Sequence, residues 1–122
     1  MKIILHGEYA TLNKYTLANR NNSGYGASIK RAETNRAVME LLNQLRGETK
    51  LVPKSVFKFT WYRKNKRTDP DNICFAKKFI LDAMQEVGMI ENDGWNQIVG
   101  FVDKFEIDKD NPRVEIEITE IE

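Results

Sequence analysis

The 122-residue chain has one cysteine, one histidine and no long hydrophobic run, and each shortage excludes a class of protein. A single cysteine, Cys74, excludes internal disulfides and Cys-based zinc clusters, and His6 alone cannot form a His-His metal site. No apolar run reaches the roughly 18 residues of a membrane-spanning helix. The apolar start, residues 3–5, is too short for a secretory signal. We expect a cytoplasmic protein with no membrane contact.

The length predicts one domain, residues 1–122, and the near-neutral net charge of +1 hides a strong asymmetry. Residues 1–78 carry 16 Lys and Arg against 6 Asp and Glu, a net charge of +10. Residues 79–122 carry a net charge of −9. This asymmetry suggests a polyanionic partner for the basic part. Two solvated charged surfaces are the ordinary alternative.

Hydrophobic periodicity predicts the element order β-α-β-α-β-β. The expected strands are 2–5, 56–62, 98–107 and 114–121, and the expected helices are 28–47 and 70–88. The Asn- and Gly-containing segment 7–28 has turn chemistry and is expected to be a loop. Residues 108–112 are expected to close a hairpin between the last two strands. These elements indicate an α/β (α+β) fold, with two helices packed on a mixed four-stranded sheet.

The expected helix 70–88 has an apolar and a charged face. With about 100° between successive residues, the charged residues Asp71, Lys78 and Asp82 fall on one line. The opposite side docks on the sheet through the apolar residues Ile73, Ala76, Ile80, Met84 and Val87. A charged outer face is also typical of any amphipathic helix.

Two carboxylates, Asp69 and Asp71, flank a rigid proline at the start of this helix. Paired carboxylates repel unless they share a cation, and oxygen ligands without Cys or a usable His suit Mg²⁺ or Mn²⁺. Asp93, in the turn after the helix, is a candidate third ligand that a chain reversal could bring back to one end of the sheet. As alternatives, Asp69 and Asp71 could simply cap the helix, and Asp93 could simply form the turn before Gly94.

A basic run immediately precedes the two carboxylates. Its residues Arg63, Lys64, Lys66 and Arg67 could bind flanking phosphates, or they could be a solvated strand end. A carboxylate-held metal can activate water, and a nearby lysine such as Lys78 can stabilise phosphoryl oxygens. Together these features favour chemistry on phosphodiesters.

Three stretches in the second half form a recognisable pattern: Arg67-Thr68-Asp69-Pro70-Asp71-Asn72, then Lys78-Phe79-Ile80-Leu81-Asp82-Ala83-Met84, then Asn92-Asp93. The pattern resembles the signature of the RusA family of Holliday-junction resolvases, often encoded in prophages, over roughly residues 56–122. The resemblance implies a homodimeric, Mg²⁺-dependent endonuclease that makes paired nicks in four-way DNA and uses no organic cofactor. It implies Asp69, Asp71 and Asp93 as the acidic, metal-binding triad and Lys78 as the functional lysine.

The match is weaker before residue 56, although residues 11–15 resemble the short Asn-containing segment after the family's first strand. We expect Lys14 in that segment to contact DNA. Residues 74–76 look like three extra residues ahead of the lysine, so Lys77 competes with Lys78. Helix geometry favours Lys78, because Lys77 points away from the charged line toward the core margin. Asn92 replaces an acidic residue of the family and is given no metal role.

Two other functions remain open at this point. The chain could be a non-catalytic module that binds branched DNA, in which the carboxylates only cap a helix. It could instead be a metal-dependent phosphohydrolase that acts on a nucleotide, which would show little salt dependence.

Overall fold

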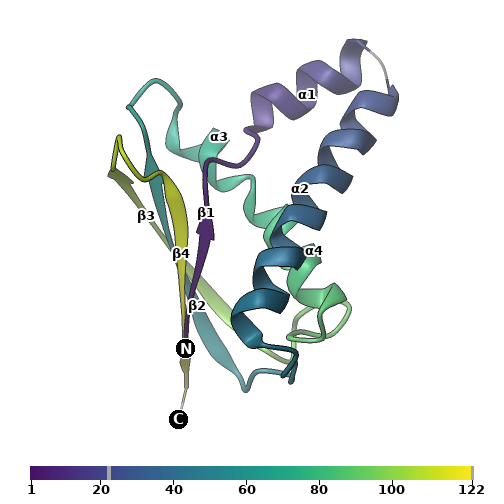
Figure 1. The fold of residues 1–122 in the computed structure, drawn as a ribbon, viewed down its shortest axis with the longest axis vertical. Helices are drawn as coiled ribbons and strands as arrows, with labels where there is room; N and C mark the ends of the chain where they lie inside the picture. The colour runs from purple at the N-terminus through teal and green to yellow at the C-terminus, as the bar shows by residue number, and fades with distance from the viewer. Residues whose placement is uncertain (22, 122) are drawn as a thin grey trace.

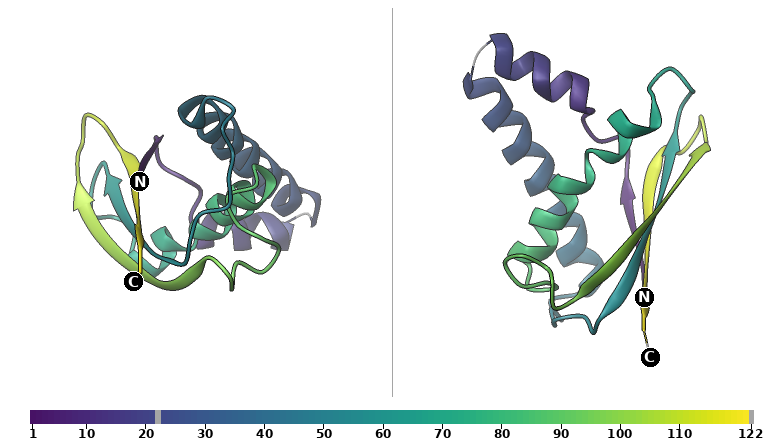
Figure 2. Two further views of the ribbon diagram at one scale, coloured as in Figure 1. Left: turned by 90° about the horizontal axis from the view of Figure 1, so that it is seen from below. Right: turned by 180° about the vertical axis from the view of Figure 1, so that it is seen from behind.

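In the computed structural model, which describes residues 1–21 and 23–121, helices cover one side of a single curved sheet (Figures 1 and 2). The elements are β1 (Lys2–His6), α1 (Leu12–Asn21), α2 (Ser23–Leu45), β2 (Ser55–Arg63), α3 (Pro70–Cys74), α4 (Lys77–Glu86), β3 (Ile98–Ile107) and β4 (Arg113–Glu120). This confirms the predicted α+β class. Within the described residues, no helix has the length and apolarity to span a membrane.

The sheet is mixed, with strand order β1-β4-β2-β3. β4 pairs antiparallel with both β1 and β2, whereas β3 pairs parallel with β2. The predicted hairpin between the last two strands is therefore wrong, because β2 lies between them. Residues 108–112 do form the expected turn. Turn residues predict a chain reversal but do not determine which strands pair. Five residues easily span the roughly 10 Å from β3 across β2 to β4.

The core lies between the sheet and the helices. Phe57, Phe59 and Trp61 of β2 are almost fully buried on the helix-facing side, as their alternation predicts. The rings of Phe59 and Trp61 stack with their centroids 5.5 Å apart. From the helices, Ala37 and Leu41 of α2 pack into this core, as do Ile73, Ala76, Phe79, Ile80, Ala83 and Met84.

The segment predicted to be a loop, residues 7–28, is mostly helical, so that prediction is wrong. α1 and the start of α2 occupy it, and Asn22 lies outside the described residues. Tertiary packing explains the difference, since the ring of Tyr15 lies 5.5 Å from Phe75 and 6.0 Å from Phe79. Glycine is typical of turns, but Gly26 lies in α2 and lets α1 approach it. A Cβ at this position would overlap the Asn19 side chain.

The predicted helix 70–88 is interrupted. It divides into α3 and α4 at Phe75 and Ala76, where the backbone stays right-handed helical. At this break the backbone hydrogen bonds connect residues three apart instead of four, from Ala76 N to Ile73 O and from Lys78 N to Phe75 O. Angles counted from Asp71 at 100° per residue therefore do not carry across the break. Gly88, at φ 84°, ends α4 as predicted.

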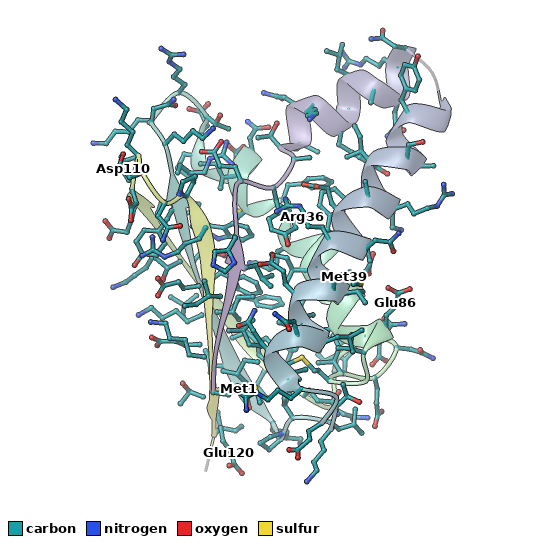
Figure 3. All side chains as sticks on the ribbon, viewed as in Figure 1. Met1, Arg36, Met39, Glu86, Asp110 and Glu120 are labelled. Atoms are coloured by element: carbon teal, nitrogen blue, oxygen red, sulfur yellow. The ribbon has the colours of Figure 1, made fainter. Side chains whose placement is uncertain are left out.

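Arg36 of α2 joins the helical layer to β1 and the segment that follows it (Figure 3). Its guanidinium donates hydrogen bonds to the carbonyl oxygens of His6 at 2.7 Å and Glu8 at 3.1 Å. It also lies 3.8 Å from the centroid of the Tyr9 ring. Burial raises the pKa of the Tyr9 hydroxyl well above its ordinary value. Glu33 supports the same segment by accepting from the Ala10 N–H at 2.7 Å.

We expect Arg36→Ala to lower the free energy of unfolding by about 2 kcal/mol, because two backbone carbonyls and one aromatic face lose a charged partner. Arg31→Ala on the same helix is the matched control, since Arg31 is exposed. Urea denaturation of the two variants measures the difference. Equal stabilities would contradict a structural role for Arg36.

Candidate active site and nucleic-acid interface

The basic loop after β2 lies at one end of the sheet. Lys64, Lys66 and Arg67 are exposed there. The loop is held by two bonds, from Lys64 N to the Glu8 carboxylate at 2.8 Å and from Arg67 N to Asn65 Oδ1 at 3.0 Å. Three cations on a fixed loop suit contact with a phosphate backbone.

Arg63 differs from these three because its side chain is only 12% exposed and pairs with Glu8 at 3.5 Å. It lines a cavity between α1, α2 and the end of β2, and the exposed Lys14 lines the same cavity. Lys14 therefore lies near the predicted basic run, while Arg63 supports the loop from beneath.

Asp69 and Asp71 follow the basic loop and are both exposed at the start of α3. Asp69 is the N-cap residue, but its side chain makes no capping hydrogen bond. One oxygen of Asp71 accepts from the Asn72 N–H at 3.0 Å. The ordinary alternative of helix capping thus does not account for the Asp69 carboxylate.

Asp93 lies at the other end of β3, in the turn between α4 and β3. Its carboxylate accepts from the Trp95 N–H at 3.1 Å. Asp69 lines a cavity with Phe105 and Ile107 near the end of β3, whereas Asp93 lines one with Phe101 near its start. The ten residues of β3 span roughly 30 Å. Within one chain, the structure therefore does not bring Asp93 to Asp69 and Asp71.

Among the described residues, no three His, Cys, Asp or Glu side chains are grouped to hold a metal ion. Asp69 and Asp71 are two exposed carboxylates two residues apart in the chain, and among the described residues no third carboxylate of the same chain joins them. Mg²⁺ commonly takes one or two carboxylates and keeps several waters, so the donor chemistry of this pair still fits that ion.

Lys77 and Lys78 point to different surroundings. Lys77 Nζ lies 2.6 Å from Asp103 Oδ2 and 4.3 Å from the centroid of the Phe101 ring. Trp61 Nε1 donates to the other oxygen of Asp103 at 2.8 Å. The Lys77 side chain is 16% exposed, so this cluster fixes α4 to β2 and β3.

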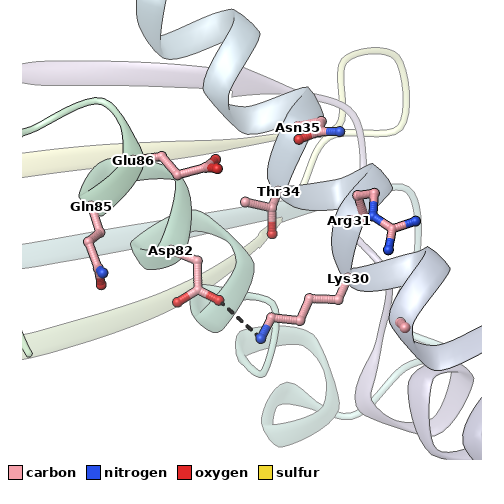
Figure 4. A pocket seen from close by; sticks show the side chains of 8 residues that line it. Lys30, Arg31, Thr34, Asn35, Asp82, Gln85 and Glu86 are labelled. Atoms are coloured by element: carbon pink, nitrogen blue, oxygen red, sulfur yellow. Dashed lines mark ion pairs between the residues drawn. The ribbon is translucent and has the colours of Figure 1, made fainter. Parts of the chain in front are cut away.

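Lys78 is 61% exposed and pairs with Asp82 one helical turn later at 3.0 Å. Lys30 of α2 reaches the same carboxylate at 3.7 Å. Figure 4 shows Lys30, Arg31 and Asp82 around a cavity of about 510 Å³ between α2 and α4. Exposed pairs of this kind contribute little stability, so Lys78 is available to an incoming anion.

Sequence reasoning missed two residues near these sites. Asp103 occupies an inward position of β3 between Phe101 and Phe105, and a carboxylate at such a position signals a buried cationic partner. Trp95 is 80% exposed at the turn that carries Asp93. Cys74 is half-buried, and burial raises the pKa of its thiol.

Taken together, an exposed carboxylate pair beside an exposed basic loop defines a site suited to an anionic backbone and a hard cation. A model of the RusA endodeoxyribonuclease family matches residues 19–119. The chain belongs to this family, whose members are Holliday-junction resolvases that act on branched DNA, and the predicted resemblance is confirmed. A search of curated proteins gave no match.

We expect Lys77 and Lys78 to differ in their contribution to the stability of the fold. Lys77→Ala should lower the free energy of unfolding by about 2 kcal/mol, because it leaves the half-buried Asp103 carboxylate without its cation. Lys78→Ala should change it by less than about 0.5 kcal/mol. Urea denaturation measures both values. A Lys77→Ala protein as stable as the unmodified chain would contradict a structural role for Lys77.

Proposed function

We propose that this RusA-family endonuclease works as a homodimer that cuts branched DNA with Mg²⁺, or Mn²⁺ in its place. Asp69, Asp71 and Asp93 are the proposed metal ligands and catalytic residues. The observation that carries the proposal is the pair of exposed carboxylates, one of them without a capping role, directly after an exposed basic loop. When bound, the cation would supply an activated water and neutralise charge on the phosphate.

The protein's own residues account for substrate binding. Lys64, Lys66 and Arg67 bind phosphates on the approach to Asp69, and Lys14 extends this surface toward α1. Because the contacts are to phosphates, binding should weaken steeply with salt and depend little on base sequence. Lys78 supplies positive charge to a phosphoryl oxygen by exchanging its exposed pairing with Asp82.

A dimer through β3 explains how Asp93 can serve the site despite its distance from Asp69. β3 is an edge strand of the sheet, and its exposed apolar side chains are Val99, Phe101, Val102, Phe105 and Ile107. An apolar edge strand of this length is a template for pairing with another chain. A second copy provides the same edge, so the contact is self-complementary under two-fold symmetry.

Antiparallel pairing of β3 with the β3 of a second copy reverses the two strand directions. The start of one β3 then lies beside the end of the other. Asp93 of each copy approaches Asp69 and Asp71 of its partner, which gives two composite sites per dimer. Three carboxylates that converge repel one another, so a shared divalent cation should also stabilise the dimer.

We expect Asp71→Asn to slow Mg²⁺-dependent cleavage of a synthetic four-way junction at least roughly 100-fold, because one ligand charge is lost at the reacting phosphate. Folding and junction binding should be retained, since Asp71 is exposed. Asp110→Asn, in the exposed turn before β4, is the matched control. Full cleavage by Asp71→Asn would remove Asp71 from the mechanism, and binding without nicks by the unmodified chain would favour a non-catalytic module.

Mixing two inactive variants tests the composite site. A dimer of one Asp71→Asn chain and one Asp93→Asn chain has one site with both defects and one intact site, if each site takes Asp93 from the partner. Random exchange should then restore nicking to about a quarter of the unmodified level, because half of the dimers are mixed. Sites formed within one chain would give no recovery, and that result would contradict the shared arrangement.

A further inference from the structure

Trp95 has the largest exposed fraction among the large hydrophobic side chains of the described residues, at 80%. Its turn is firmly held. Ile98 N donates to Gly94 O at 2.8 Å, and Asn96 donates to the Glu91 carboxylate at 2.6 Å. A well-ordered turn therefore presents an indole to solvent, where its burial by a partner would be strongly favourable.

A cavity of about 260 Å³ lies at the opposite end of β3. Ile73, Phe105 and Ile107 provide apolar walls, while Lys66 and Asp69 lie at its polar side. An apolar cavity of roughly 150 Å³ holds a benzene ring. This cavity is therefore large enough for an indole.

We propose that Trp95 of one copy occupies this cavity of the second copy. The inference rests on the proposed β3 dimer and identifies the residue that fixes its register. The two-fold axis of an antiparallel pair within one continuous sheet is perpendicular to that sheet, so the helices of both copies lie on the same side. The turn at residues 91–97 and the cavity beside Asp69 both lie on that side, at opposite ends of β3.

Charge complementarity supports a second copy as the occupant. Glu91 and Asp93 flank the indole on the turn. Arg63 and Lys66 line the cavity together with Asp69 and Glu106, and Lys64 and Arg67 add positive charge on the loop beside it. Antiparallel pairing brings each acidic turn near the basic loop of the other copy, so the two segments attract each other at a distance while the cationic head groups stay exposed to phosphates. Trp95 then acts as a positioning residue, because seating its ring sets the distance between Asp93 and the carboxylates of its partner.

Two single-cysteine proteins test the contact, both in a Cys74→Ser background. One carries Asn96→Cys, which keeps Trp95, and the other carries Ile107→Cys. Mild oxidation of the mixture should give a covalent dimer, whereas each protein alone should give none, because equivalent residues are a strand length apart in an antiparallel pair. No cross-link in the mixture, or cross-linking of each protein alone, would overturn the proposal.

Fluorescence and sedimentation provide the second test. Trp61, the other tryptophan, is buried in each chain, so a blue shift of emission on raising the protein concentration reports burial of Trp95. Trp95→Ala should raise the dimer dissociation constant at least about 10-fold. Met39→Ala, which truncates a side chain 68% exposed on α2, should leave it unchanged.

The outcomes separate this proposal from the proposed function. If Trp95→Ala dimerises with unchanged affinity and Trp95 emission shifts only when junction DNA is added, the indole contacts DNA and the Trp95 contact between the two copies is overturned. In that case, recovery of nicking in mixed dimers would still support the shared active site. If mixed dimers show no recovery and the unmodified chain is monomeric, the shared site itself fails.

Discussion

The position of β3 at the edge of the sheet, parallel to β2, is the constraint on which the rest of the site depends. Parallel strands begin at the same end of a sheet. Asp69 follows the end of β2 and Asp93 precedes the start of β3, so the two carboxylates are held a strand length apart. No rotation of their side chains can close that gap. The same constraint leaves one side of β3 unpaired, and this side is the surface of the proposed dimer.

The Lys77, Asp103 and Trp61 cluster keeps this edge in place. Asp103 joins the helical layer to the outermost strand through Lys77 and joins that strand to the central one through Trp61. This ion pair fixes the orientation of β3 as well as stabilising it, because both charged hydrogen bonds of Asp103 can form in only one placement of the strand. β3 therefore offers a second chain a fixed surface.

The sequence was most informative where one physical requirement dominated. The alternation in residues 56–62 predicted a strand, and in the structure every second side chain of β2 faces the helices. The segment before Ser28 misled because Asn and Gly are typical of turns, yet Gly26 provides room for α1 against α2. Such a use depends on a contact between two helices, which local composition cannot reveal. Pairing of β3 was equally hidden, since alternation specifies faces but not neighbours.

The two lysines of α4 show how far sequence spacing alone can define the candidate site. Residues 74–76, which look like extra residues in the sequence comparison with the RusA signature, include the break between α3 and α4. The break leaves α4 free to set its own rotation, so Lys78 meets Asp82 one turn later while Lys77 turns inward to Asp103. Because both lysines lie within α4, their expected directions agree with the structure, Lys77 inward and Lys78 outward. Sequence spacing could not relate either lysine to Asp71, since that relation crosses the break.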